Sequence, residues 1–223
     1  MPKDLKFNPI HYVTYNYTSD LRVLRYQGRE TKDIRPFYAD GDTWKMGAGD
    51  RHWPLYGSYI AGSWLLALEG EKDVDTALAL GIPAVCPRGK ASDKTLPTLY
   101  KQLKDCGVAG IVAIADNDVA GKHSADIAVE SATIAGLPAF AIGISDLWPV
   151  APEKSDLTDY SRSHPVPRTH QIIDQINAIA ADRISAIKIE VEAAKPGRGL
   201  IDAIDALIDQ NLVGAQMDAA ILE

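Results

Sequence analysis

Two patterns of hydrophobic and polar positions follow one another along the chain. In residues 10–60, β-branched and aromatic residues alternate with polar ones in short runs, and turn-forming residues separate these runs. The runs cover residues 10–17, 21–26 and 33–38. This pattern predicts a small antiparallel β module that exposes basic side chains.

From residue 64 onward, continuous apolar runs alternate with segments of helical periodicity. The apolar runs cover residues 64–68, 83–86, 110–115 and 137–142, and helices are expected at 74–80, 96–104 and 119–135. Buried strands that alternate with helices are typical of a parallel sheet with helices on both faces. We therefore predict an α/β fold for residues 62–163.

The remaining residues, 164–223, carry two stripes of isoleucine and leucine at helical spacing, separated by Pro196-Gly-Arg-Gly199. They predict a helical pair that packs on the α/β domain or docks another subunit. The expected organisation is thus a strand-rich basic module (1–61), an α/β domain (62–163) and a C-terminal helical pair (164–223).

Composition places the chain among ordinary globular proteins, with 223 residues, of which 46% are hydrophobic. No apolar run approaches the length of a membrane span, no signal peptide is visible, and two cysteines cannot build a disulfide framework or a zinc ribbon. We expect a cytoplasmic protein. The net charge of -7 argues against nucleic-acid binding, but it is uneven. Residues 1–56 carry about +2, residues 57–163 about -5 and residues 164–223 about -4.

Acidic residues follow the predicted strands at three places. They are Glu69 and Asp73 after the first strand, Asp116 and Asp118 after the third, and Asp156 and Asp159 after the fourth. Because ligands bind at the carboxyl ends of the strands in open α/β sheets, we expect these acids to share one edge. Clustered carboxylates repel each other unless a cation is present, and oxygen ligands suit Mg²⁺ or Mn²⁺. The pattern favours chemistry on phosphate groups.

Three motifs carry these acids: Leu-Ala-Leu-Glu-Gly-Glu-Lys-Asp-Val-Asp at 66–75, Ala-Ile-Ala-Asp-Asn-Asp-Val-Ala-Gly at 113–121, and Lys-Ser-Asp-Leu-Thr-Asp-Tyr at 154–160. Together they resemble the Toprim domain of bacterial-type primases, phage primase-helicases, topoisomerases and some nucleases. The resemblance covers about residues 62–160. The first motif is most similar to that of primases, whereas the third departs from them because Ser155 separates Lys154 from Asp156.

The resemblance implies roles for individual residues. Asp116 and Asp118 would hold the metal, assisted by Asp156 and Asp159. Glu69 would act as general base or as a further ligand, and Asp73 would tune Glu69 or bind a second metal. Basic residues would hold nucleic acid or nucleotide phosphates: Arg25, Arg35, Lys45, Lys72, Arg88 and Lys90.

The predicted function is that of a primase-type nucleotidyltransferase that joins nucleoside triphosphates into short primers on single-stranded DNA with Mg²⁺ or Mn²⁺, in a phage, plasmid or bacterial replication system. A replicative helicase could be a partner in trans, since the chain lacks the Gly-x-x-x-x-Gly-Lys-[Ser/Thr] loop of ATP-driven helicases. The alternatives are a Toprim nuclease and a non-catalytic module that binds nucleic acid or a partner. Tyr15 and Tyr17, with Arg22 and Arg25, are either a stacking platform for bases or ordinary packing residues.

Overall fold

A computed structural model describes residues 9–89, 94–164, 174 and 178. The chain divides into two compact units between Tyr56 and Gly57. The sequence pattern placed this division at residue 61, a few residues later, because it gave no sign of the short strand β5 (Tyr56–Ser58), which already belongs to the second sheet. The predicted helical pair at 164–223 falls almost entirely outside the described residues.

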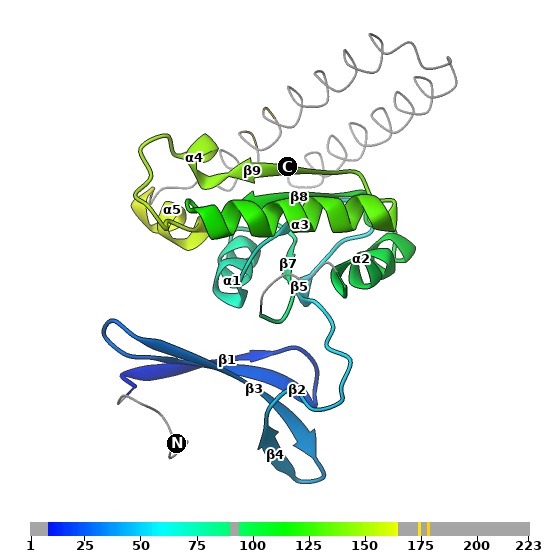
Figure 1. Ribbon diagram of the computed structural model, residues 1–223, viewed down its shortest axis with the longest axis vertical. Coiled ribbons are helices and arrows are strands. Elements are labelled where there is room, and N and C mark those ends of the chain that lie inside the picture. The colour runs from blue at the N-terminus through cyan, green and yellow to red at the C-terminus, as the bar shows by residue number, and fades with distance from the viewer. Residues whose placement is uncertain (1–8, 90–93, 165–173, 175–177, 179–223) are drawn as a thin grey trace. The chain divides into compact units, whose positions relative to one another are not determined.

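The first unit contains a four-stranded antiparallel sheet whose strands neighbour each other in chain order. The strands are β1 (His11–Asn16), β2 (Leu21–Gln27), β3 (Lys32–Asp40) and β4 (Thr43–Met46) (Figure 1). The register pairs Tyr15 with Val23 and Arg22 with Phe37. Because neighbouring residues of a strand point to opposite faces, these two pairs lie on opposite sides of the sheet. The fourth strand was not expected from the sequence: it is only four residues long, and all four of its residues are exposed.

One side of this sheet carries the small core of the first unit. The core consists of Tyr15, Leu21, Val23 and Trp53, with Tyr17, Tyr38 and Tyr56 packed against it. The ring of Tyr17 lies 5.1 Å from that of Trp53, edge to face. Tyr15 and Tyr17 are therefore packing residues, as the plainer of the two sequence interpretations held.

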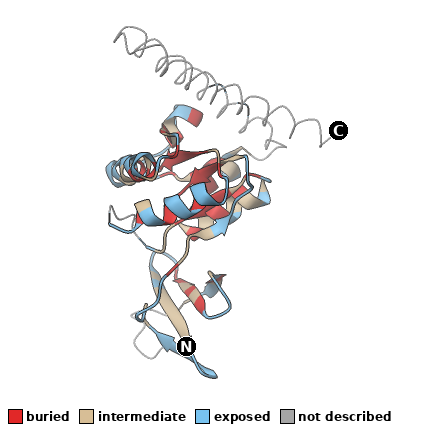
Figure 2. Ribbon diagram, turned by 90° about the vertical axis from the view of Figure 1, so that its right-hand side faces the viewer, coloured by how far each residue is buried: buried red, intermediate tan, exposed pale blue. Residues whose placement is uncertain are grey.

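The other side of the sheet is partly open. The guanidinium of Arg22 lies 3.7 Å from the ring centre of Trp44 and 6.0 Å from that of Phe37. In Figure 2 the strands of this unit are mostly intermediate or exposed, in contrast to the buried strands of the second unit. The first unit therefore depends on a few aromatic contacts for its stability.

The second unit contains a five-stranded sheet in the order β5-β7-β6-β8-β9. Its further strands are β6 (Trp64–Ala67), β7 (Ala84–Cys86), β8 (Gly110–Ala115) and β9 (Ala139–Gly143). β6 pairs in parallel with both β7 and β8, and β8 pairs in parallel with β9. The chain leaves β6 toward β7 on one side and then returns to β8 on the other. The strand order thus reverses between β6 and β8, where open α/β sheets bind their ligands.

Helices connect and cover these strands. They are α1 (Glu71–Ala79), α2 (Leu96–Asp105), α3 (Val119–Ala135), α4 (Ile144–Leu147) and α5 (Leu157–Ser163). α3 packs on β8, β9 and α2, whereas α1 packs on β7 and α5. Right-handed crossovers in opposite directions place α1 on one face of the sheet and α2 and α3 on the other. The predicted α/β class with a parallel sheet and a preceding strand-rich module is confirmed.

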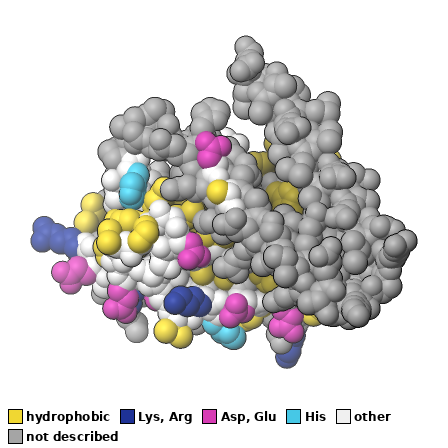
Figure 3. All heavy atoms as spheres, turned by 90° about the horizontal axis from the view of Figure 1, so that it is seen from above, with side chains coloured by type: hydrophobic (Ala, Val, Ile, Leu, Met, Phe, Trp, Pro, Cys, Tyr) yellow, Lys and Arg dark blue, Asp and Glu magenta, His cyan; other side chains and the backbone are white. Residues whose placement is uncertain are grey.

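The strongest predicted strand and helix are found as expected. All six residues of β8 are buried, and α3 ends at Gly136, which adopts the left-handed conformation with φ of 74°. None of the helices within the described residues is long and apolar enough to span a membrane. On the described part of the face seen in Figure 3, acidic side chains are spread among hydrophobic and neutral ones, and no continuous basic patch is visible.

Replacing Trp53 with alanine should unfold the first unit at lower denaturant concentration. The side chain of Trp53 is 8% exposed, and its indole donates a 3.0 Å hydrogen bond to the carbonyl of Ala48. Loss of a large aromatic side chain from a core costs about 3–5 kcal/mol. Urea unfolding followed by limited proteolysis of residues 9–56 measures the effect. Ile10→Ala is the control, because Ile10 is 66% exposed and should change stability little; equal effects of the two variants would contradict the assigned core.

Candidate active site at the ends of β6 and β8

Two carboxylates lie at the point where the strand order reverses. Glu69 follows β6 by two residues, and Asp116 follows β8 directly. The Oε1 atom of Glu69 is fully buried and has no hydrogen-bond partner among the residues that the structure describes. A buried carboxylate oxygen without a donor is costly, so its retention is characteristic of a site that binds a ligand or a cation.

The electrostatics of Asp116 show that acids from all three motifs gather around it. Burial raises the pKa of Asp116 from 3.8 to about 8, and the negative charges of neighbouring carboxylates add to the effect. In order of strength, these neighbours are Glu69, Asp73, Asp156 and Asp118. The structure therefore brings together five of the six acids selected from the sequence.

The turn between β8 and α3 fixes Asp118. Asp118 is the N-cap of α3, and its Oδ1 accepts a 2.7 Å hydrogen bond from the backbone N–H of Gly121. Gly121 packs so closely on this turn that a Cβ would lie 2.6 Å from the carbonyl oxygen of Asp116. The Asp-x-Asp-x-x-Gly spacing thus has a local reason, because the glycine lets the helix start directly beside the two acids.

The residue between these two acids holds the third motif in place. The side-chain amide of Asn117 donates 2.9 Å hydrogen bonds to the carbonyls of Ala151 and Pro152. Its backbone N–H donates to the carbonyl of Ser155, and its own carbonyl accepts from Lys154. Asn117 therefore fastens the segment before α5 to the end of β8, and this brings Asp156 to Asp116.

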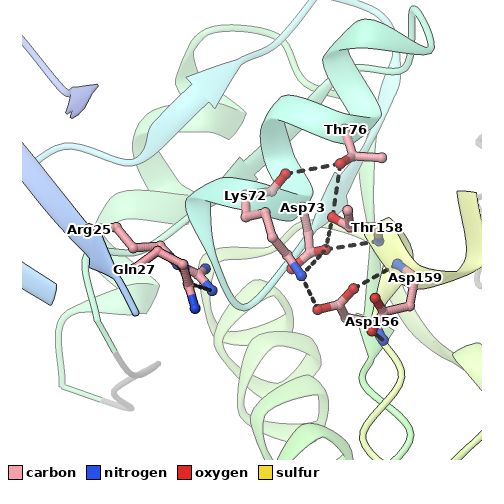
Figure 4. Close-up of polar contacts among 8 residues, drawn as sticks. All are labelled: Arg25, Gln27, Lys72, Asp73, Thr76, Asp156, Thr158 and Asp159. Atoms are coloured by element: carbon pink, nitrogen blue, oxygen red, sulfur yellow. Dashed lines mark hydrogen bonds and ion pairs between the residues drawn. The ribbon is translucent and has the colours of Figure 1, made fainter. Parts of the chain in front are cut away.

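Asp156 is the N-cap of α5, and its two carboxylate oxygens accept hydrogen bonds from Asp159 and Lys72 (Figure 4). Its Oδ1 accepts a 2.9 Å hydrogen bond from the backbone N–H of Asp159, and its Oδ2 accepts one from the ammonium of Lys72. Burial acts to raise the pKa of Asp156, but the hydrogen bonds from Lys72 and Asp159 outweigh it and hold the pKa below its usual range. The charge of Asp156 acts on both Asp116 and Asp73, so Asp156 lies close to these acids.

Asp159 occupies a different position. It is the third residue of α5, and its carboxylate lies 3.5 Å from the backbone N–H of Asp156, so the two form a capping box. Asp159 is not among the carboxylates that raise the pKa of Asp116. The observed contacts of Asp159 therefore serve the start of α5.

Asp73 links α1 to α5. It is 6% exposed, and its Oδ1 accepts hydrogen bonds from both the hydroxyl of Thr158, at 2.6 Å, and the backbone N–H of Thr158, at 3.0 Å. Thr76 lies one turn further along α1, and its hydroxyl is 2.9 Å from that of Thr158 (Figure 4). Burial and then the charge of Asp156 raise the pKa of Asp73. Asp73 thereby positions the helix that carries Asp156.

The basic residues selected from the sequence come from both units. Arg88 follows β7 and so lies at the same edge of the sheet as the acids, whereas Lys90 is outside the described residues. Arg25, Arg35 and Lys45 belong to the first unit and contact Gln27, Asp33 and Asp40, respectively. Lys72 reaches the acids directly, because its ammonium contacts both Asp156 and Asp73.

The acids fit a divalent cation in their chemistry. They offer only oxygen ligands, one of which is the buried Oε1 of Glu69, and their mutual repulsion calls for positive charge. Within the described residues, however, no three acidic, histidine or cysteine side chains already stand in an arrangement that would hold an ion. Two of the acids are engaged otherwise, since Lys72 binds Asp156 and Thr158 binds Asp73.

Sequence reasoning missed Asn117, Thr158 and Thr76 as parts of the site. Asn117 was visible between two selected acids, and a residue inside such a turn is well placed to hold a neighbouring segment. The two threonines gave no comparable signal, because they are 82 positions apart in the sequence and only the packing of α1 on α5 brings them together.

No family model and no curated protein sequence matches this chain. Several solved primase structures are similar to it in part. The zinc-binding and RNA polymerase domains of the Aquifex aeolicus primase are 14% identical, with a TM-score of 0.49 over 87% of this chain and 51% of that chain. A DNA primase domain from Pseudomonas aeruginosa is 19% identical, with a TM-score of 0.45 over 91% of this chain and 68% of that chain. The primase fragment of the bacteriophage T7 primase-helicase protein is 16% identical, with a TM-score of 0.46 over 74% of this chain and 62% of that chain. This chain thus spans about half of the length of the Aquifex chain.

Replacing Asp116 with asparagine should stabilise the metal-free protein at alkaline pH. Between about pH 4 and about pH 8, folded Asp116 keeps a proton that the unfolded chain releases, so wild-type stability falls as the pH rises through this range. The amide that replaces the carboxylate has no charge to repel, and we expect the melting temperature of Asp116→Asn to exceed that of the wild type by about 2–4 °C near pH 8.5 and by less near pH 5. Differential scanning calorimetry without divalent metal measures this, with the exposed Asp126→Asn on α3 as control. Equal melting temperatures near pH 8.5 would contradict the raised pKa of Asp116.

Replacing Thr158 with valine should loosen the junction of α1 and α5. The variant keeps the shape of the side chain but removes the hydroxyl donor to the buried Asp73, at a cost of about 1–3 kcal/mol. Chemical denaturation measures the loss, and amide exchange over residues 157–163 locates it. Thr158→Ser is the matched control, since it keeps the hydroxyl and should lose less than half as much. A serine variant as unstable as the valine variant would show that the hydrogen bond is not responsible.

Proposed function

We propose that this chain is the catalytic core of a primase-type nucleotidyltransferase, which joins nucleoside triphosphates into short primers on single-stranded DNA. The observation that carries this proposal is the convergence of four acids on Asp116 where the strand order of the sheet reverses. Such a cluster binds substrates whose own charge is negative only when divalent cations balance it, as in phosphoryl transfer. Bound Mg²⁺ or Mn²⁺ would supply charge neutralisation at the phosphate oxygens.

The roles of the acids follow from their positions. Asp116 and Asp118 come from one rigid turn and, with Asp156, would hold the metal. Glu69 has a buried oxygen without a donor and would accept the proton of the attacking 3′-hydroxyl, or serve as a further ligand. Asp73 is committed to Thr158, so it would keep Asp156 in place. The backbone N–H of Asp159 would also hold Asp156 in place, because it donates a 2.9 Å hydrogen bond to Oδ1 of Asp156.

The remaining basic residues would contact the substrates. Arg88 lies beyond β7, at the edge of the sheet where the phosphates of a nucleotide would meet the metal. Arg25, Arg35 and Lys45 lie on the sheet of the first unit, which has a net positive charge, and would hold the template through its phosphates. The proposal includes that the activity depends on Mg²⁺, that the chain binds the template strand, and that a helicase acts as its partner.

Incubation with single-stranded DNA, labelled ribonucleotides and Mg²⁺ tests the proposal. New oligonucleotides support the primase function, whereas shortened template with no new product would favour phosphodiester cleavage by the same acids. We expect Glu69→Gln and Asp116→Asn to lower the rate of product formation at least about 100-fold, because each removes a charge that the transition state requires.

The controls separate chemistry from folding. Asp126→Asn removes one charge from an exposed position of α3 and should leave the rate unchanged. Asp116→Asn is expected to be at least as stable as the wild type, so its inactivity cannot come from unfolding. If Asp116→Asn keeps wild-type activity, the proposed catalytic site is wrong.

A further inference from the structure

The side chain of Lys72 lies among the acids of the proposed active site. Its ammonium binds Oδ2 of Asp156 and lies 4.0 Å from Oδ1 of Asp73 (Figure 4). The side chains are largely withdrawn from solvent, with exposed fractions of 27% for Lys72, 16% for Asp156 and 9% for Asp73. Ion pairs of this kind are screened far less than surface pairs.

The position of Lys72 on its helix is unfavourable for a cation. It is the second residue of α1, next to the positive end of the helix dipole, where acidic residues are preferred. Both of its neighbours in the first turn of the helix, Glu71 and Asp73, are acidic. Local helix energetics therefore do not explain the lysine, whereas its long-range contact with Asp156, 84 positions away, does.

The charges around Lys72 give it a function when no metal is present. Asp156 and Asp73 are two of the four acids whose charges act on Asp116, and both contact the same ammonium. A divalent cation bound by Asp156 would occupy the space and the carboxylate oxygen that the ammonium holds. The two cations would therefore compete for this carboxylate oxygen.

We propose that Lys72 is a built-in counter-ion that balances the acids in the metal-free protein and competes with the divalent cation for Asp156, so that it sets the metal affinity of the site. This inference rests on the metal site of the proposed function. Lys72 is thus a positioning residue for the acids, and metal binding requires its ammonium to leave Asp156. The same contact that stabilises the metal-free protein would weaken metal binding.

Titration of the whole protein with MnCl₂, followed by calorimetry and by electron paramagnetic resonance of free Mn²⁺, tests the proposal without any activity assay. We expect Lys72→Met to bind Mn²⁺ about tenfold more tightly than the wild type, because the competing charge a few ångströms away is gone. Without metal the variant should melt at a lower temperature than the wild type, and saturating Mn²⁺ should raise its melting temperature by more than it raises that of the wild type.

Three further variants make the result specific. Lys101→Met removes the same charge from an exposed pair with Asp105 at 3.2 Å and should bind Mn²⁺ like the wild type. Lys72→Arg keeps the charge and should also stay near the wild-type affinity. Lys72→Gln keeps a donor to Asp156 without charge, so it should bind Mn²⁺ more tightly even if the methionine variant does not fold.

Unchanged or weaker Mn²⁺ binding in the neutral Lys72 variants would overturn the proposal, and so would a loss of melting temperature that is equal with and without metal. Absence of binding in every variant would overturn the metal site of the proposed function, and this inference with it. Tighter binding in the neutral variants combined with no primer synthesis by the wild type would leave the competition established and overturn the primase function alone.

Discussion

Repulsion among carboxylates is the constraint on which the second unit depends. Burial raises the pKa of Asp116 to about 8, and the charges of acids from three separate segments add to the rise. Such a cluster opposes folding unless protons, an internal cation or a bound metal offset its charge. The structure contains the internal cation, because the ammonium of Lys72 lies on Asp156, and the raised pKa of Asp116 favours its protonated form.

Neutral hydrogen bonds hold the cluster together from outside. Asn117 fastens the segment that precedes α5 to the end of β8, and Thr158 fastens the start of α5 to Asp73 on α1. The donors in these contacts are uncharged, so they hold the segments together without adding charge to the site. Gly121 has no side chain, and this allows α3 to start directly beside Asp116.

The distribution of charge gives the net value of -7 a different meaning. A large part of the negative charge of residues 57–163 is concentrated at one edge of the sheet. These acids alone repel a phosphate, whereas a divalent cation bound among them would attract one. The first unit keeps a small positive charge on an open sheet with Arg22 stacked on Trp44. The net charge of the whole chain therefore does not describe the charge at the candidate site.

The sequence alone determined the α/β class, most of the strands and helices, and the acids worth inspecting, because apolar runs and helical periodicity are local properties of the chain. It also suggested that Asp116 and Asp118 act as a pair, since a single turn carries both. Only the tertiary structure decided the strand order that puts Glu69 beside Asp116, the contact of Lys72 with Asp156 and the bond of Thr158 to Asp73. These contacts join positions more than eighty residues apart or depend on which strands pair, and no local pattern encodes such pairings. Asp156 and Asp159 look equivalent in the sequence, and only the tertiary structure separates them. The charge of Asp156 acts on Asp116, whereas Asp159 is part of the capping box at the start of α5.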